Sequence, residues 1–484
     1  MFDFYIKSTK PASWVPFLGL IGLYYLFLLS NGSMALFGVE QLDRTFDSML
    51  LHLLRGDAGV SPEAIGYESF TRNGKTYAYF GIVPALLRLP ALVLAADPEE
   101  MHLARFSCLI AVTVYAGIIL RTVWAAHRTL LPECRHSVLL ASVVVSVVFS
   151  GAPITMLSAG YVYSEPVLWS AVLVAGFNLI VIRSVLAYRV FTGAELCGLA
   201  FLSGLALNTR ATAGIDLMVS FGFILVWYSL TRFRGVKQAS SWSALIAAGF
   251  VMGAGLLLIG WVNEARWGNP LTFADLPRQD ILHRHPERLS QLLANGAFNV
   301  RRIPIALSYY FAGLPYIFKY HGVVGEFLRT LYDGIEGPPS SPLLTSPLWT
   351  LLAVIGVRPA FRRGPVIAAT FAGHALAAFI LLGAMSLTLR YRMDMAGLIG
   401  LPAAFGYIVL SNWLSRQTPK FRGPAFGAVI VMSAVGIVGS HYVLIMSKIL
   451  NPAVPAEVRC WLQPIAPFVP VHTSDPLPIG CRGD

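Results

Sequence analysis

Two aspartates stand four residues apart in the segment "FGVEQLDRTFDSMLLHLLRGD". The apolar spacing after Leu42 predicts a short helix on which Asp43 and Asp47 share a face, with about 6 Å between their Cβ atoms. Like charges at this spacing cost stability unless a cation, a metal ion or a shared proton uses them. The pair, with Glu40 upstream, is therefore a candidate for general-base or metal chemistry. A solvated helix face with Arg44 as partner explains the spacing equally well.

A third acid begins an apolar run in "GYVYSEPVLW". Glu165 stands directly before a predicted helix, beside the aromatic residues Tyr161 and Tyr163. A lone acid at this position often only complements the helix dipole. Because an ionisable group amid apolar residues at a membrane face is costly, Glu165 is also a candidate to orient a substrate or a metal ion, with Tyr163 as a binding neighbour.

Arginines mark the ends of later apolar runs. Arg210 lies in "LNTRATAG", and Arg390 and Arg392 lie in "LTLRYRMDM". A guanidinium group holds phosphate oxygens in a two-pronged way, so these residues are candidates for a phosphate site. Boundary arginines that reach lipid headgroups are the ordinary alternative, and Asp394 could pair with Arg390 internally. Lys75, in "RNGKTYAYFG", adds a cation beside aromatic residues.

Evidence for a bound metal ion or a soluble nucleotide is weak. His283 and His285 in "ILHRHPERL" have no fixed third ligand nearby in the sequence, so they do not define a metal site. The sequence contains no P-loop, no GxGxxG, no nucleophile elbow and no Cys/His zinc pattern. A soluble-nucleotide enzyme is therefore not indicated, and the metal requirement stays open.

Apolar helices must position these residues. The chain has 484 residues, of which 56% are hydrophobic and 13% charged, and this apolar content exceeds what one soluble core could use. Apolar windows lie at about 14–30, 103–122, 137–157, 166–184, 194–209, 212–230, 242–262, 343–357, 366–386, 393–412 and 425–446. We therefore expect an all-α polytopic membrane protein with about eleven spans. The net charge of +11 lies in short loops, where it orients the spans and does not indicate nucleic acid.

The stretch "YAYFGIVPALLRLPALVLAA", residues 77–96, has the length of a span but carries Arg88 between Pro84 and Pro90. With the N-terminus inside and eleven spans, Lys and Arg collect on one side of the membrane and the acids of 32–102 on the other. A twelfth span at 77–96 would reverse this arrangement for all later loops. We therefore predict an interfacial or re-entrant helix, with Arg88 reaching headgroups or an internal carboxylate.

This topology divides the chain into a transmembrane domain, residues 1–446, and an outer tail, residues 447–484. Two large outer regions interrupt the spans, at 31–102, where interfacial helices are expected, and at 263–342. Cys460 and Cys481 bracket a Pro-rich segment of the tail, and a disulfide between them would be consistent with an oxidising compartment.

Short motifs carry a resemblance to a known family. "RNGKTYAYFGIVPALLRLP", "GLALNTRATAG" and "RYRMD" resemble stretches of the GT-C class of polyprenyl-phosphate-dependent membrane glycosyltransferases, and are similar to the bacterial protein mannosyltransferase and aminoarabinose transferase families. The resemblance implies a GT-C-like fold. It also implies that an acid of the first outer loop, Asp43 or Asp47, acts as base, and that Glu165 is the second acid. The sequence departs from the family in having Ala211 where Pro commonly follows the Arg, and in lacking an Asp-Glu dyad near Asp43.

The function implied is transfer of a sugar from a polyprenyl-phosphate-linked donor to an envelope acceptor, a lipid, a glycan or a protein. The reaction would face the periplasm from the bacterial inner membrane, with inversion expected by resemblance. Arg210, Arg390 and Arg392 would hold the phosphate beside membrane lipids. A transporter or flippase of lipid-linked sugars is the alternative, for which charges deep within helices and repeat symmetry are expected. A non-catalytic assembly subunit is the third reading.

Overall fold

The computed structural model describes residues 15–93, 97–234, 240–318, 322–338, 340–451 and 454–465. This part of the chain is mostly helical and has very little sheet, which confirms the all-α prediction. Its strands form two small sheets: β1 (Phe70–Arg72) pairs antiparallel with β2 (Lys75–Tyr77), and β3 (Gly334–Ile335) pairs parallel with β4 (Ser386–Leu387).

Eight apolar segments are long enough to cross a membrane. They are α7 (Ala104–Arg128), Ser137–Ser158, α10 (Ser164–Leu186), α12 (Ala211–Phe233), α13 (Trp242–Trp267), α21 (Pro365–Leu382), α23 (Ala396–Arg416) and α24 (Pro419–Leu450). The second of these is built from α8 (Ser137–Phe149), α9 (Ala152–Thr155) and η4 (Met156–Ser158). Three shorter apolar helices, α2 (Val15–Leu29), α11 (Gly193–Leu207) and α20 (Pro347–Phe361), match the remaining predicted windows. Each window thus coincides with an apolar helix, while the count of eleven spans stays a prediction.

Small residues let the helices pack closely. A Cβ atom on Gly406 of α23 would lie 1.8 Å from the carbonyl oxygen of Leu352 in α20, and one on Gly356 of α20 would lie 2.0 Å from the carbonyl oxygen of Pro402. These distances are far below van der Waals contact, so only glycine fits at both positions. Close approach of this kind favours helix association where no water is available to drive it.

One pair of ionisable side chains lies deep between three of these helices. His374 of α21 places Nδ1 2.7 Å from a carboxylate oxygen of Asp216 in α12, and Nε2 2.9 Å from the amide oxygen of Asn178 in α10. All three side chains are buried. Because every partner comes from a different helix, the group ties α10, α12 and α21 together.

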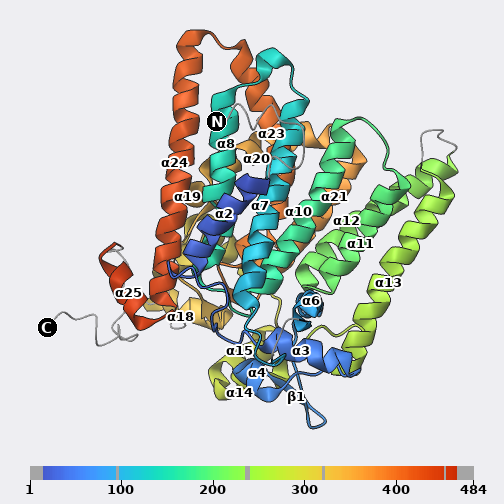
Figure 1. The fold of residues 1–484 in the computed structure, drawn as a ribbon, viewed down its shortest axis with the longest axis vertical. Helices are drawn as coiled ribbons and strands as arrows, with labels where there is room; N and C mark the ends of the chain where they lie inside the picture. Colours follow the sequence, from blue (N-terminus) through green and yellow to red (C-terminus); the bar gives the residue numbers. More distant parts are fainter. Residues whose placement is uncertain are drawn as a thin grey trace.

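The first outer region lies at one end of the bundle (Figure 1). It consists of α3 (Thr45–Leu54), α4 (Pro62–Ile65), η2 (Gly66–Glu68), the β1–β2 hairpin, α5 (Val83–Leu86) and α6 (Leu89–Leu92). The described part of 77–96 is thus two four-residue helices instead of one span, as predicted, because Pro84 and Pro90 each start a new helix. Phe46 and Phe80 bury their rings with Val262 of α13, which anchors the region to the bundle.

The second outer region packs beside the first at the same end (Figure 1). Its elements are η5 (Leu276–Arg278), α14 (Asp280–Arg284), α15 (Pro286–Asn295), η6 (Val300–Arg302), α16 (Ile303–Ala312), α17 (Leu314–Phe318) and α18 (Gly322–Leu331). The next helix, α19 (Pro342–Thr345), lies farther into the bundle, where the carbonyl of Thr345 accepts from the Ser440 hydroxyl of α24 at 2.8 Å (Figure 1). The backbone N–H of Asp280 donates to the carbonyl of Ser69 at 2.9 Å, which joins the two regions. The β3–β4 pairing then links this region to α22 (Tyr391–Asp394).

The remaining short elements are η3 (Pro132–Cys134), α25 (Ala456–Leu462) and η7 (Gln463–Ile465). Cys481, half of the predicted Cys460–Cys481 disulfide, lies outside the described residues, so that pairing stays a prediction.

Candidate active site

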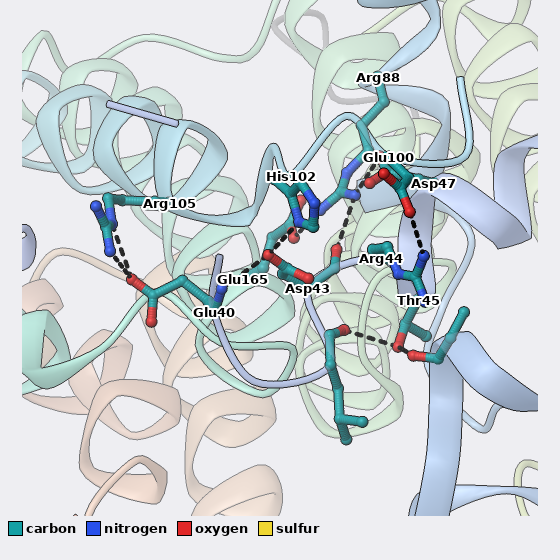
Figure 2. Close-up of polar contacts among 12 residues, drawn as sticks. Glu40, Asp43, Arg44, Thr45, Asp47, Arg88, Glu100, His102, Arg105 and Glu165 are labelled. Atoms are coloured by element: carbon teal, nitrogen blue, oxygen red, sulfur yellow. Dashed lines mark hydrogen bonds and ion pairs between the residues drawn. The ribbon is translucent and has the colours of Figure 1, made fainter. Parts of the chain in front are cut away.

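Arg88 joins two of the predicted catalytic acids. It lies between α5 and α6, and its guanidinium group donates to Asp47 at 2.5 Å and to Glu165 at 2.6 Å (Figure 2). Asp47 belongs to the first turn of α3 and Glu165 to the first turn of α10. The three side chains, here called the buried triad, are 2%, 0% and 0% exposed. The sequence prediction that Arg88 reaches an internal carboxylate is therefore confirmed.

The burial of the triad limits what Asp47 can do chemically. Burial raises the pKa of Asp47, and the neighbouring Arg88 cation opposes that rise. Oδ2 of Asp47 is buried and has no hydrogen-bond partner among the described residues. The alternative of a solvated helix face with Arg44 is wrong, because Asp47 is buried against Arg88 while Arg44 pairs with Glu100 at 3.1 Å.

Asp43 precedes α3 and has different partners. Its Oδ2 accepts from the backbone N–H of Glu40 at 2.8 Å and lies 2.8 Å from Nδ1 of His102. The His102 side chain is 26% exposed, and its φ of 47° lies in the left-handed region that few non-glycine residues adopt. Arg88 also donates to the carbonyl of Asp43 at 3.2 Å. The Asp43–His102 pair is thus attached to the buried triad but remains partly open to solvent (Figure 2).

A second group of residues gathers the predicted binding residues Tyr163, Arg210 and Arg390. We call it the tyrosine–arginine cluster, and its members are Glu68, Tyr163, Arg210, Glu336, Arg390, Tyr391 and Asp394. The Arg390 guanidinium lies over the Tyr163 ring, 4.6 Å from its centre, and 3.6 Å from the carboxylate of Glu336. Arg390 is 21% exposed and Glu336 44%, so this ion pair is open to solvent.

Glu68 closes one side of the cluster. The Tyr163 hydroxyl donates to its Oε1, and the Gln279 side-chain amide donates to its Oε2 at 2.6 Å. Burial raises the pKa of Glu68, against the hydrogen bond from Tyr163. The acid therefore fixes the Tyr163 ring under Arg390 and connects the cluster to the second outer region.

Arg210 closes the other side. It donates to Asp394 from Nε at 2.7 Å and from Nη2 at 2.9 Å, and its guanidinium lies 5.7 Å from the centre of the Tyr391 ring. Asp394 thus pairs with Arg210, which corrects the suggestion that it pairs with Arg390. This two-pronged pair holds α12 and α22 together, while the Arg210 side chain is 17% exposed.

The two groups adjoin at the start of α10, where Tyr163 and Glu165 are two residues apart. Gln41, in the turn before Asp43, donates to the Tyr67 hydroxyl at 2.6 Å and accepts from the backbone N–H of Val162 at 3.4 Å. The turn that carries Asp43 is therefore in contact with the segment that carries Tyr163.

Two predicted binding residues lie apart from this group. Arg392 donates to the hydroxyl groups of Ser340 and Thr345 and lines a largely apolar cavity of about 230 Å³ with Tyr310 and Trp349. Lys75 sits on the β1–β2 hairpin, 59% exposed, and pairs with Asp57 at 3.3 Å.

The described residues contain no group of three or more His, Cys, Asp or Glu side chains that could hold a metal ion. His285, considered as a metal ligand, instead lies 3.4 Å from Glu287. The metal requirement is therefore not settled by any such cluster.

Sequence reasoning missed His102, Glu68 and Glu336. His102 and Glu336 lie in irregular segments and Glu68 ends the short 3-10 helix η2, so no periodicity marks any of them. The signals available were weak: His102 stands directly before a predicted span in "EEMHLARF", and Glu336 stands in the turn sequence "DGIEGPP".

Sequence and structure comparisons give different results. No protein-family model matches the chain, and no curated protein matches it. The fold is similar to the apo oligosaccharyltransferase of Archaeoglobus fulgidus, with 12% identity over 97% of this chain and 60% of that one and a TM-score of 0.50. The chain thus spans about 60% of the length of that enzyme.

Two further solved structures are less similar in geometry. The oligosaccharyltransferase AglB of Archaeoglobus fulgidus, in complex with an inhibitory peptide and a dolichol-phosphate, is 12% identical over 97% of this chain and 61% of that one, with a TM-score of 0.47. ArnT from Cupriavidus metallidurans, bound to undecaprenyl phosphate, is 14% identical over 94% and 70%, with a TM-score of 0.43. The likeness to the first of these structures shows that this chain shares the fold of that oligosaccharyltransferase.

Proposed function

We propose that this chain is a glycosyltransferase that moves a sugar from a polyprenyl-phosphate-linked donor to an acceptor of the cell envelope, a lipid, a glycan or a protein. The observation that supports this most is that two partly exposed arginines, Arg210 and Arg390, belong to a cluster whose Tyr163 segment contacts the turn carrying the Asp43–His102 pair, through the Val162–Gln41 hydrogen bond. The two arginines could bind a phosphate group, and the Asp43–His102 pair could accept a proton.

Arg390 is the residue proposed to hold the donor phosphate. Its pairing with Glu336 is long, at 3.6 Å, and open to solvent, so a phosphate oxygen could replace that carboxylate. Tyr163 beneath it keeps the guanidinium plane in place. Arg210 adds positive charge nearby, and the apolar cavity lined by Arg392 offers a place for part of the isoprenoid chain.

The proton is assigned to the Asp43–His102 pair. As the acceptor hydroxyl attacks the anomeric carbon and the bond to the lipid phosphate breaks, His102 Nε2 takes the hydroxyl proton while Asp43 holds Nδ1–H. The lipid phosphate leaves with the bonding electrons, and its charge is offset by Arg390. A direct displacement of this kind inverts the anomeric centre. Asp47, which is buried against Arg88, supports the site without taking the proton.

We assign the reaction to the periplasmic side of the bacterial inner membrane. Arg105, which pairs with Glu40 of the first outer region, lies in the first turn of α7, while Arg128 ends the helix on the opposite side of the bundle. Arg128 and Arg135 belong to the short basic loops that the topology rule assigns to the cytoplasm. The carboxylates and the arginines of the proposed site would then all face outward.

The test uses purified protein in lipid nanodiscs with radiolabelled polyprenyl-phosphate sugars and a crude envelope extract. We expect label to pass to the extract, and Arg390→Ala to reduce the transfer at least tenfold. Arg284→Ala is the matched control, because this exposed arginine pairs only within α14, with Asp280. Absence of transfer with every lipid-linked donor would contradict the proposal, and label that crosses the bilayer of vesicles without joining an acceptor would favour the flippase.

A further inference from the structure

We infer that Arg88 supplies the cation that the two facing carboxylates need, so that the reaction proposed above requires no divalent metal ion between Asp47 and Glu165. The two acids come from distant segments, α3 and α10, and both accept hydrogen bonds from this guanidinium. Each gives it one oxygen, at 2.5 and 2.6 Å. Two facing carboxylates without a cation would repel each other, and one cation between them removes that repulsion.

The charges and the ligand set both disfavour a metal ion at this position. Arg88 leaves one buried oxygen of each carboxylate without a hydrogen-bond partner among the described residues, Oδ2 of Asp47 and Oε1 of Glu165. A divalent cation takes about six or more oxygen ligands, and within the described residues no third His, Cys, Asp or Glu side chain joins these two to form a metal site. Arg88 stays charged at any pH a protein experiences, so the metal would also meet a fixed positive charge. The residues present therefore fit one guanidinium and do not fit a metal ion beside it.

Arg88 has no room to leave. Its guanidinium lies 5.4 Å from the centre of the buried Phe46 ring and donates to the Asp43 carbonyl, and the side chain is 2% exposed. Pro84 and Pro90 fix the short helices on either side of it. The cation is thus part of the fold and does not exchange with solvent.

The same contacts make Arg88 a positioning residue. By holding Asp47, Glu165 and the Asp43 carbonyl together, it attaches the first outer region to the start of α10. It thereby sets where the Asp43–His102 pair stands relative to Tyr163. A bound metal would otherwise have to make this connection.

The test measures metal binding without requiring transfer activity. Thermal unfolding of the purified protein in nanodiscs is followed with 1 mM MnCl₂, with EDTA, and with neither. For the native sequence we expect the same midpoint in all three conditions. Arg88→Ala leaves two unpaired carboxylates, and we expect Mn²⁺ to raise its midpoint by about 2 °C or more, with EDTA reversing the rise.

Matched variants isolate the cause. Arg88→Ala combined with Asp47→Asn should lose the response to Mn²⁺, because one of the two carboxylates is gone. Arg88→Lys keeps a cation and should not respond. If Arg88→Ala does not fold, the native protein and Arg88→Lys still test the inference, and we expect neither unfolding midpoint to change with Mn²⁺ or EDTA. A midpoint that falls with EDTA in the native protein but not in Asp47→Asn would overturn the inference.

The outcome is separable from that of the proposed function. If no donor supports transfer, the glycosyltransferase proposal fails while the Mn²⁺ measurement still stands. If transfer occurs and EDTA abolishes it in the native protein, with Mn²⁺ restoring it, the function stands and the inference about Arg88 fails.

Discussion

The buried triad and the tyrosine–arginine cluster use the same residue types in opposite surroundings. In the triad, Arg88 and its two acids are at most 2% exposed, and every charge is committed to another. In the cluster, Arg390 and Glu336 keep 21% and 44% of their side-chain surface exposed and stand 3.6 Å apart. The difference indicates that the two groups have different roles. The triad holds the first outer region in place, and the cluster is accessible to a ligand.

The largest effect is expected in the triad. Arg88→Ala should lower the free energy of unfolding by about 3–5 kcal/mol, because it leaves two buried carboxylates without a partner. Denaturant unfolding in detergent micelles measures this. Arg44→Ala, which removes a pair with both side chains exposed, should cost less than about 1 kcal/mol. Equal losses of unfolding free energy in Arg88→Ala and Arg44→Ala would contradict the structural role assigned to the triad.

The next effect concerns the proton. His102→Gln should reduce the transfer rate about 100-fold with little change in the donor KM, because the glutamine side chain cannot accept the acceptor's proton. Steady-state kinetics with a labelled donor separates kcat from KM. An unchanged rate would return the role of base to a carboxylate, either Asp43 itself or Asp47.

A smaller effect is expected from a change of cation in the cluster. Arg390→Lys keeps the charge and loses the planar fork, so we expect the donor KM to rise about tenfold while kcat changes little. The measurement is a donor titration at fixed acceptor concentration. An unchanged KM together with an unchanged kcat would place Arg390 outside phosphate binding.

The smallest effect is expected at Lys75. Because its pair with Asp57 lies on an exposed hairpin, Lys75→Ala should change stability by less than about 0.5 kcal/mol and leave the donor KM within twofold of the native value. A tenfold rise in KM would restore Lys75 to the substrate site, as the sequence motif suggested.

Much of this arrangement was predictable from the sequence. Apolar period and length located the helices, and the distribution of Lys and Arg placed Asp43, Glu165 and Arg390 at one end of them. The one-sided distribution of Lys and Arg, with the prolines around Arg88, predicted that 77–96 is no span and that Arg88 reaches headgroups or an internal carboxylate.

The choice of partners was not predictable. Whether Asp394 pairs with Arg210 or Arg390, and whether Asp47 faces solvent or Arg88, depends on how segments far apart in sequence pack together. His102 and Glu336 lie in irregular loops, where neither a period of 3.6 nor a motif marks a residue. Such loops take their conformation from contacts with the rest of the fold, so their side chains can be assigned only in three dimensions.

The pairing of β3 with β4 has a further consequence for how a ligand would enter. The backbone N–H groups of Asp333 and Glu336 donate to Met385 and Leu387, at 3.1 and 2.8 Å, so the loops that carry Glu336 and Arg390 are joined through their main chains. Exchange of one anion for another on Arg390 then needs the exposed Glu336 side chain to turn and release its 3.3 Å hydrogen bond from the backbone N–H of Leu389, while the loops stay where they are. Rotamer changes of exposed side chains take picoseconds to nanoseconds. The rate at which a lipid phosphate occupies Arg390 would accordingly be set by lipid diffusion to this side of the membrane.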